Sequence, residues 1–181
     1  MGNRKEDKEN ELIIRARNGD SKAFRALVDI HKDKSLSLAL SIIKNKSLAE
    51  DILQEVFIKV HRNLGRFKFK SKFSTWLYKI VVNTCNNELR RHKNNILIEE
   101  SEVVINLSTK RIDHQILLLQ DQKEYIQKAM EQLKMDEALV IRLFYLCEMS
   151  LKEIEIITKF STSKIRVDLH RGRKNLHLIL K

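Results

Sequence analysis

None of the 181 residues is a proline, and only four are glycines. Both residue types commonly end helices, and an average chain of this length would carry roughly nine prolines. Apolar residues also recur at three- and four-residue spacing over most of the chain, which is the pattern of amphipathic helices. The sequence therefore predicts an all-α protein.

The helical pattern divides into two units. Its breaks at residues 18–20 and 64–65 suggest that the first unit has three or four helices. Between the units the periodicity weakens and the residues become locally acidic, as in a linker. We expect two small helical domains, at residues 10–93 and 122–181, joined by a flexible acidic linker at residues 94–121.

Positive charge is concentrated in one part of the chain. Lysine and arginine outnumber aspartate and glutamate by 35 to 24, a formal net charge of +11 that favours a polyanionic partner. A basic protein with no nucleic-acid role could have the same net charge, so the placement of the charge decides. Residues 66–93 hold eight lysines and arginines against one carboxylate, Glu88. This concentration favours nucleic-acid binding.

Several function classes are not expected. Cys85 and Cys147 lie far apart and the histidines lack zinc-site spacing, so no disulfide, metal or cofactor is expected. The charged N-terminus and the short longest apolar stretch, residues 139–147, argue against a signal peptide or membrane insertion and for a cytoplasmic location. The glycines form no phosphate-binding loop and no paired-carboxylate motif is present, so we expect no catalytic residues and no enzyme.

An acidic helix face is predicted in the first domain. The pattern Ser47-Leu48-Ala49-Glu50 is that of a capping box, so a helix is expected to begin there. Apolar residues follow on one face, and the opposite face carries Asp51, Gln54 and Glu55. Such a face is either solvated or a docking surface, and the helix alone does not decide between them.

The segment from Arg66 to Lys79 interleaves aromatic and basic residues. Aromatic rings stack on unpaired bases while cations follow phosphates, so this composition suits single-stranded nucleic acid. Trp76 is expected in the core, whereas Phe67 and Phe69, set among lysines, are expected to stay accessible. The helix that follows carries a stripe of amide and cationic side chains suited to bases and phosphates: Lys79, Asn83, Asn86 and Arg90.

The second domain has the outline of a helix-turn-helix. Ser150 and Glu153 form a second capping box, the helix they open breaks near residues 159–162, and a new helix starts at Ser161 or Thr162. The second helix could enter a major groove, although a helical hairpin without a DNA role has the same outline. Gly172 on its apolar face indicates a close helix contact. Its outward residues are Lys164, Arg166, His170, Arg171, Arg173 and Lys174.

These motifs resemble sigma factors of the extracytoplasmic-function (ECF) group, which keep only region 2 and region 4 of the sigma-70 family. Residues 49–57 look like the region 2.2 helix, and residues 73–83 look like the W-L-x-x-I-x-x-N signature. Residues 144–154 and 169–173 look like region 4. The resemblance implies a transcription initiation factor that binds core RNA polymerase, directs it to −10 and −35 promoter elements and assists strand opening.

The resemblance also implies roles for individual residues. Core polymerase would be bound by Asp51, Gln54 and Glu55. The −10 element, partly single-stranded, would be bound by Lys68, Lys70, Lys72, Lys79, Asn83, Asn86 and Arg90. The double-stranded −35 element would be bound by Thr162, Ser163, Lys164, Arg166, His170, Arg171 and Arg173. The linker would follow the polymerase's RNA path, and the family leaves room for an anti-sigma factor as a further partner.

Four positions depart from the family pattern. Lys134 replaces a proline, Phe69 and Lys159 stand where many members have glycine, and Asp168 stands where many are basic. A lysine in the helix-turn-helix turn must adopt a positive φ at some cost or use another turn geometry. The main alternative function is a stand-alone helix-turn-helix regulator, which would explain the second domain but neither the acidic face nor the aromatic segment.

Overall fold

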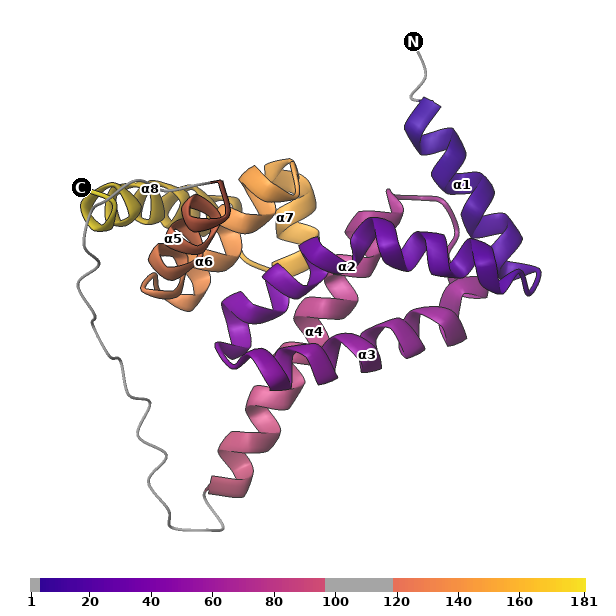
Figure 1. The fold of residues 1–181 in the computed structure, drawn as a ribbon, viewed down its shortest axis with the longest axis horizontal. Coiled ribbons are helices and arrows are strands. Elements are labelled where there is room, and N and C mark those ends of the chain that lie inside the picture. Colours follow the sequence, from indigo (N-terminus) through magenta and orange to yellow (C-terminus); the bar gives the residue numbers. More distant parts are fainter. Residues whose placement is uncertain (1–3, 97–118) are drawn as a thin grey trace.

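The computed structural model describes residues 4–96 and 119–181, and all of its regular elements are helical (Figure 1). The first domain consists of α1 (Arg4–Arg17), α2 (Ser21–Ile43), α3 (Lys46–Asn63), the 3₁₀ turn η1 (Leu64–Arg66) and α4 (Phe73–Ile96). The second consists of α5 (Leu119–Glu131), α6 (Met135–Ile141), the π-helical turn η2 (Arg142–Leu146), α7 (Leu151–Thr158) and α8 (Thr162–Ile179). The all-α prediction is confirmed. Most of the expected linker lies outside the described residues.

In the first domain, α2 packs against α1, α3 and α4. The chain turns between α1 and α2 at Gly19, whose φ of +92° is one that glycine adopts without strain. Asp20 then caps α2 by accepting hydrogen bonds from the backbone N–H groups of Lys22 and Ala23. The core of the bundle is mainly aliphatic, although Phe73 and Tyr78 are also buried in it, and it includes Ile13, Leu27, Leu38, Val56, Leu77 and Val81.

The predicted start of α3 is wrong by two residues. The N-cap is Asn45, whose side chain accepts a hydrogen bond from the backbone N–H of Leu48, and the helix begins at Lys46 rather than at a box formed by Ser47 and Glu50. The reason lies in the end of α2, where Lys44 takes a left-handed conformation with φ of 55°. Asn45 is then the first extended residue, and its side chain is well suited to capping.

In the second domain, α8 packs closely on α6. A Cβ atom placed on Gly172 would lie 2.9 Å from Cγ1 of Ile141, closer than real Cβ contacts come. The close contact expected at this glycine is therefore confirmed, and it explains why a residue that weakens helices stands in the middle of α8. Ile165 and Leu169 are buried on the same face of α8.

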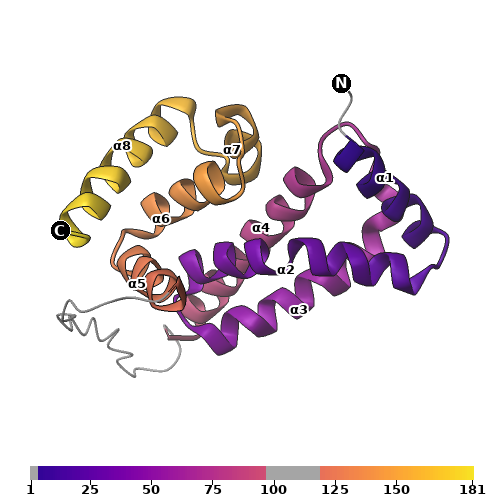
Figure 2. The same cartoon turned by 45° about the horizontal axis from the view of Figure 1, so that its top comes forward.

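The two domains pack against each other, with α7 contacting α4 and α6 contacting α2 (Figure 2). Thr75 Oγ1 donates a hydrogen bond to Glu153 Oε1 at 3.2 Å, and Lys72 Nζ lies 3.6 Å from the same carboxylate oxygen. At the second contact, Arg142 Nε donates to Ser37 Oγ at 2.8 Å. Burial lowers the pKa of Arg142, which is only 4% exposed, so closing the domains carries a desolvation cost.

Candidate nucleic-acid interface

The acidic face of α3 points away from the bundle core. Asp51 and Gln54 are exposed, while Glu55 is half-buried and its Oε1 lies 2.6 Å from Lys59 Nζ. The opposite face of α3 is buried in the core. Two of the three residues expected to contact polymerase are therefore exposed, and the third forms an ion pair with a neighbouring lysine.

The loop between η1 and α4 presents lysines and one aromatic ring to solvent. Lys68, Lys70 and Lys72 are exposed. Phe69 is 40% exposed and has φ of +54°, in the left-handed region that bulky side chains rarely adopt. Its ring centroid lies 4.9 Å from that of Phe67. Backbone strain that holds an aromatic ring in solvent is a feature found at binding sites.

The expectation that Phe67 stays accessible is wrong, because this residue is only 4% exposed. Its ring packs against Phe73 and Trp76, with centroid distances of 5.6 and 5.4 Å, in the tilted and edge-on arrangements that aromatic rings favour. Trp76 is half-buried against the core, as expected. The loop thus closes over the start of α4 with one of its two aromatic rings inside and the other, Phe69, outside.

A hollow of about 490 Å³ adjoins this loop. Residues 69–74 form one part of its lining, and α1 and α2 contribute Glu9 and His31, whose Oε1 and Nε2 atoms lie 2.7 Å apart. Cys147 and Glu148 of the second domain also line it. The second domain therefore covers one side of the space next to the loop between η1 and α4.

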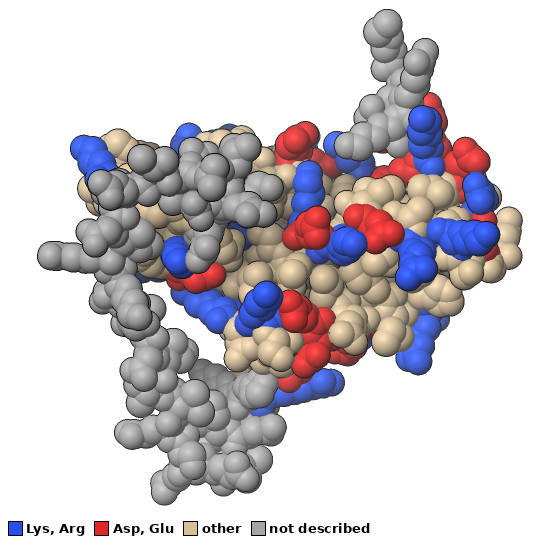
Figure 3. All heavy atoms as spheres, viewed as in Figure 1, with Lys and Arg blue, Asp and Glu red and all other residues tan. Residues whose placement is uncertain are grey.

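The predicted polar stripe of α4 lies partly in solvent. Asn83 and Arg90 are exposed, while Lys79 and Asn86 are half-buried. Basic and acidic side chains are interspersed on the face of the molecule seen in Figure 3, so the net charge does not form one continuous basic patch there. Candidate contacts must therefore be assigned residue by residue.

The helix-turn-helix forms as predicted at its caps and turn. Ser150 and Glu153 make both hydrogen bonds of the capping box at the start of α7. Lys159 ends α7 in the left-handed region with φ of 63°, so the lysine takes the strained option of the two. Ser161 then caps α8 by accepting from the backbone N–H of Lys164 at 3.3 Å.

The outward face of α8 is polar and cationic, with two exposed apolar residues in it, Val167 in the middle and Leu178 near the end. Thr162 is half-buried, and Arg173 Nε donates to the Leu169 carbonyl at 3.2 Å. Val167 is 45% exposed. The remaining exposed residues of this face are Ser163, Arg166, His170, Arg171, Arg173 and Lys174.

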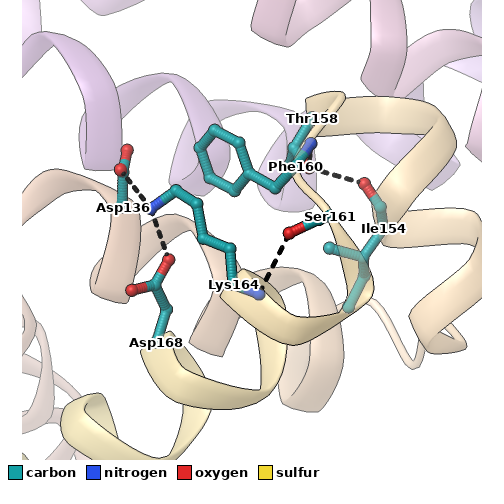
Figure 4. A network of polar contacts seen from close by, with 7 residues as sticks. All are labelled: Asp136, Ile154, Thr158, Phe160, Ser161, Lys164 and Asp168. Atoms are coloured by element: carbon teal, nitrogen blue, oxygen red, sulfur yellow. Dashed lines mark hydrogen bonds and ion pairs between the residues drawn. The ribbon is translucent and has the colours of Figure 1, made fainter.

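Lys164 is held by two carboxylates on the inner flank of α8 (Figure 4). Its Nζ lies 2.7 Å from Asp136 Oδ2 and 2.7 Å from Asp168 Oδ2, and 4.3 Å from the centre of the Phe160 ring. Partial burial lowers the pKa of Lys164, but the hydrogen bonds to both carboxylates outweigh it and hold the pKa above its usual value. Its charge is thus neutralised within the domain.

The comparisons with known proteins follow the same division of the chain. Residues 27–95 match the family model of sigma-70 region 2, and residues 123–176 match that of sigma-70 region 4. The ECF RNA polymerase sigma factor SigW of Bacillus subtilis is 32% identical over 187 residues, covering 91% of this chain and 92% of that protein. This chain is an ECF sigma factor. The ECF RNA polymerase sigma-E factor of Escherichia coli K12 is 31% identical, covering 90% of this chain and 89% of its own.

Solved sigma-factor structures share the fold. The sigma factor RpoE of Bartonella quintana, solved with the anti-sigma factor NepR, has a TM-score of 0.71 at 21% identity and covers 88% of this chain and 97% of its own. CnrH, solved with the cytosolic domain of CnrY, has a TM-score of 0.64 at 20% identity over 96% of this chain and 97% of its own. As a sigma factor, the chain is a transcription initiation factor that directs RNA polymerase to promoters, and the stand-alone regulator is not favoured.

Sequence reasoning missed three features of this sigma factor. The contact of Glu153 with Thr75 joins residues far apart in the chain, and no local sequence pattern predicts it. The pairing of Lys164 with Asp136 was hidden for the same reason. The exposure of Val167 could have been found, because helical spacing places it on the cationic face of α8.

Among the described residues no helix is long and apolar enough to cross a membrane, and no cluster of side chains could hold a metal ion.

Proposed function

We propose that this sigma factor uses three separate surfaces. The exposed face of α3 binds core polymerase, and the outward face of α8 binds the −35 element. The −10 element is bound by the lysine loop, which consists of residues 67–72, together with the polar stripe of α4. The observation that carries the proposal is that each predicted set lies on an accessible face of a helix or loop whose other face is buried in a domain core. Residues 10–93 and 122–181 are the proposed domains, with residues 94–121 as the linker.

The polymerase surface can be tested by titrating the N-terminally labelled full-length chain with bacterial core RNA polymerase. The double variant Asp51→Arg, Gln54→Ala should bind at least about tenfold more weakly, because a charge of opposite sign replaces a docking carboxylate. Asp33→Arg makes the same charge change at an exposed position of α2 and should bind like the wild type. Equal affinity of the double variant and the wild type would remove α3 from the interface.

The −10 surface combines exposed lysines with the ring of Phe69. The lysines would follow the phosphates of the unpaired strand, and the ring would stack on a base, an interaction worth roughly 1–3 kcal/mol. Asn83 and Asn86 carry amides that can pair with base edges. Strand opening would then use binding energy and no nucleotide hydrolysis, which fits a family of non-enzymatic transcription factors.

The −35 surface consists of the α8 residues that the structure leaves accessible. Arg166, His170 and Arg171 lie on the outward face, with Ser163 near the N-terminus of the helix. Lys164 was expected in this set, and we propose that it acts on DNA binding through the position of α8, because two carboxylates already hold its ammonium group.

We further propose that the protein works in the cytoplasm, where core polymerase is found, and has no catalytic activity of its own. The likeness to a sigma factor solved with an anti-sigma factor supports a protein partner of that kind. Such a partner would compete with core polymerase in the titration described above.

A further inference from the structure

Val167 is an apolar residue in the middle of a polar, cationic surface. It is 45% exposed and has no place in the hydrophobic core. Residues one turn before and after it on the same face are Ser163, His170 and Arg171, and Arg166 precedes it; all four are exposed. A single exposed valine is unremarkable by itself. However, Val167 lies within the surface proposed to bind the −35 element, where an apolar side chain can contact the edge of a base.

The rotation of α8 about its own axis is fixed on its inner side. Lys164 bridges Asp136 of α6 and Asp168 of α8, as Figure 4 shows. Gly172, one turn after Asp168, lies so close to Ile141 of α6 that even a methyl group on this glycine would clash. Since α8 cannot turn without breaking both contacts, Val167 is held facing away from α6 together with Arg166 and Arg171.

A valine side chain has one kind of partner among the groups in the major groove. The base edges there present hydrogen-bond donors and acceptors, and the single apolar group is the C5-methyl of thymine. A β-branched side chain in a helix keeps essentially one rotamer, so its two methyl groups are presented without a large entropy cost. The surrounding cations suit phosphates and disfavour an apolar protein surface as the occupant.

We propose that Val167 is a specificity-determining residue that packs on the C5-methyl of a thymine in the −35 element. The proposal rests on the proposed role of the outward face of α8. Asp168, which is 6% exposed and bonded to Lys164, takes no part in base contacts. Lys164 and Asp168 are positioning residues that hold the valine in its direction.

The test uses deoxyuridine, which lacks only the C5-methyl group of thymine. The full-length chain, assembled with core polymerase, first selects its preferred −35 duplex from a pool randomised at that element, with the −10 element held constant. Each thymine of the selected duplex, on either strand, is then replaced singly by deoxyuridine. One replacement should weaken binding by about fourfold, the value of burying one methyl-sized group.

The Val167→Ala variant should lose this discrimination and bind the thymine and deoxyuridine duplexes equally. Leu178→Ala, which truncates an exposed apolar residue at the end of α8, should keep the fourfold difference. The inference is overturned if no deoxyuridine replacement weakens wild-type binding, or if Val167→Ala keeps the full difference. Selection without any sequence preference at the −35 element would instead overturn the proposed role of α8. The helical circular dichroism of each variant confirms that it is folded.

Discussion

Thr75→Val should loosen the packing of the two domains without disturbing either one. Thr75 is 2% exposed, its Oγ1 donates to Glu153 Oε1 at 3.2 Å and it lies 4.0 Å from Met149 Sδ. Valine has nearly the same shape and is β-branched like threonine, so the change removes the hydroxyl group and little else. The first domain keeps its core, and Glu153 keeps its capping box with Ser150.

The size of the effect follows from what Glu153 loses. A hydrogen bond to a charged group contributes about 1.5–3 kcal/mol. The lower end applies here, because the Glu153 carboxylate keeps its hydrogen bonds to Ser150 and its ion pair with Lys72. A loss of about 1.5 kcal/mol shifts the equilibrium between packed and separated domains roughly tenfold toward separation.

The two cysteines provide the assay. Burial raises the pKa of the Cys147 thiol to about 11 and that of the Cys85 thiol to about 12, so neither reacts readily at neutral pH in the closed structure. Cys147 lines the hollow between the domains, whereas Cys85 lies in the core of the first domain. Alkylation followed by mass spectrometry should show Cys147 reacting about tenfold faster in Thr75→Val, with Cys85 unchanged.

The matched control is Thr84→Val on the same helix. Thr84 is also buried, but its hydroxyl accepts from Lys59 of α3 within the first domain. This variant should leave the Cys147 rate unchanged. If Thr75→Val alters the Cys147 rate by less than twofold, as a rough limit, or accelerates both cysteines equally, the contact does not hold the domains together and the reasoning is refuted.

Four changes test other parts of the structure. Lys159→Gly should raise the free energy of unfolding by about 0.5–1 kcal/mol in urea denaturation, because glycine takes the left-handed turn without strain. Phe69→Ala, at an exposed ring, should cost little stability in the same experiment yet weaken single-stranded −10 DNA binding by roughly 1–3 kcal/mol. Arg166→Ala should reduce the slope of a plot of the logarithm of the −35 binding constant against the logarithm of the salt concentration by about one. Lys164→Met should reduce this slope less, because Asp136 already neutralises that lysine. Folding raises the pKa of Lys164, so its ion pairs should contribute fully to the free energy of unfolding below pH 10.5 and should lose this contribution as the pH rises through the higher folded pKa. Alkaline unfolding should show this pH-dependent loss for the wild type and not for Lys164→Met.

Much of the fold could be predicted because its signals are local. The capping box at Ser150, the cap at Ser161 and the apolar stripe of α8 depend on residues three or four positions apart. The misplaced start of α3 shows the limit of such signals. Asn45 and Ser47 are both good caps, and the left-handed end of α2 at Lys44 decides between them.

Other features could not be predicted because they depend on packing between distant segments. Phe67 is set among lysines, yet it is buried because α4 brings Phe73 and Trp76 beneath the loop. The candidate site divides in the same way. Helical spacing correctly placed Arg166 and His170 on the outward face of α8, but it could not show that α6 carries a carboxylate opposite Lys164.

The packed arrangement of the domains cannot be the one that spans a promoter. The positions that name the −10 and −35 elements differ by about 25 base pairs, which is about 85 Å at roughly 3.4 Å per base pair. A compact chain of this length has a radius of gyration of only about 16 Å. The packed molecule is therefore too small to reach both elements at once. The domains must therefore separate, and contacts between them such as that of Glu153 with Lys72 must break. Binding to polymerase and DNA must supply the free energy of separating the domains. Because Thr75→Val favours the separated domains about tenfold, it should strengthen the binding of the holoenzyme to promoter DNA by up to about the same factor.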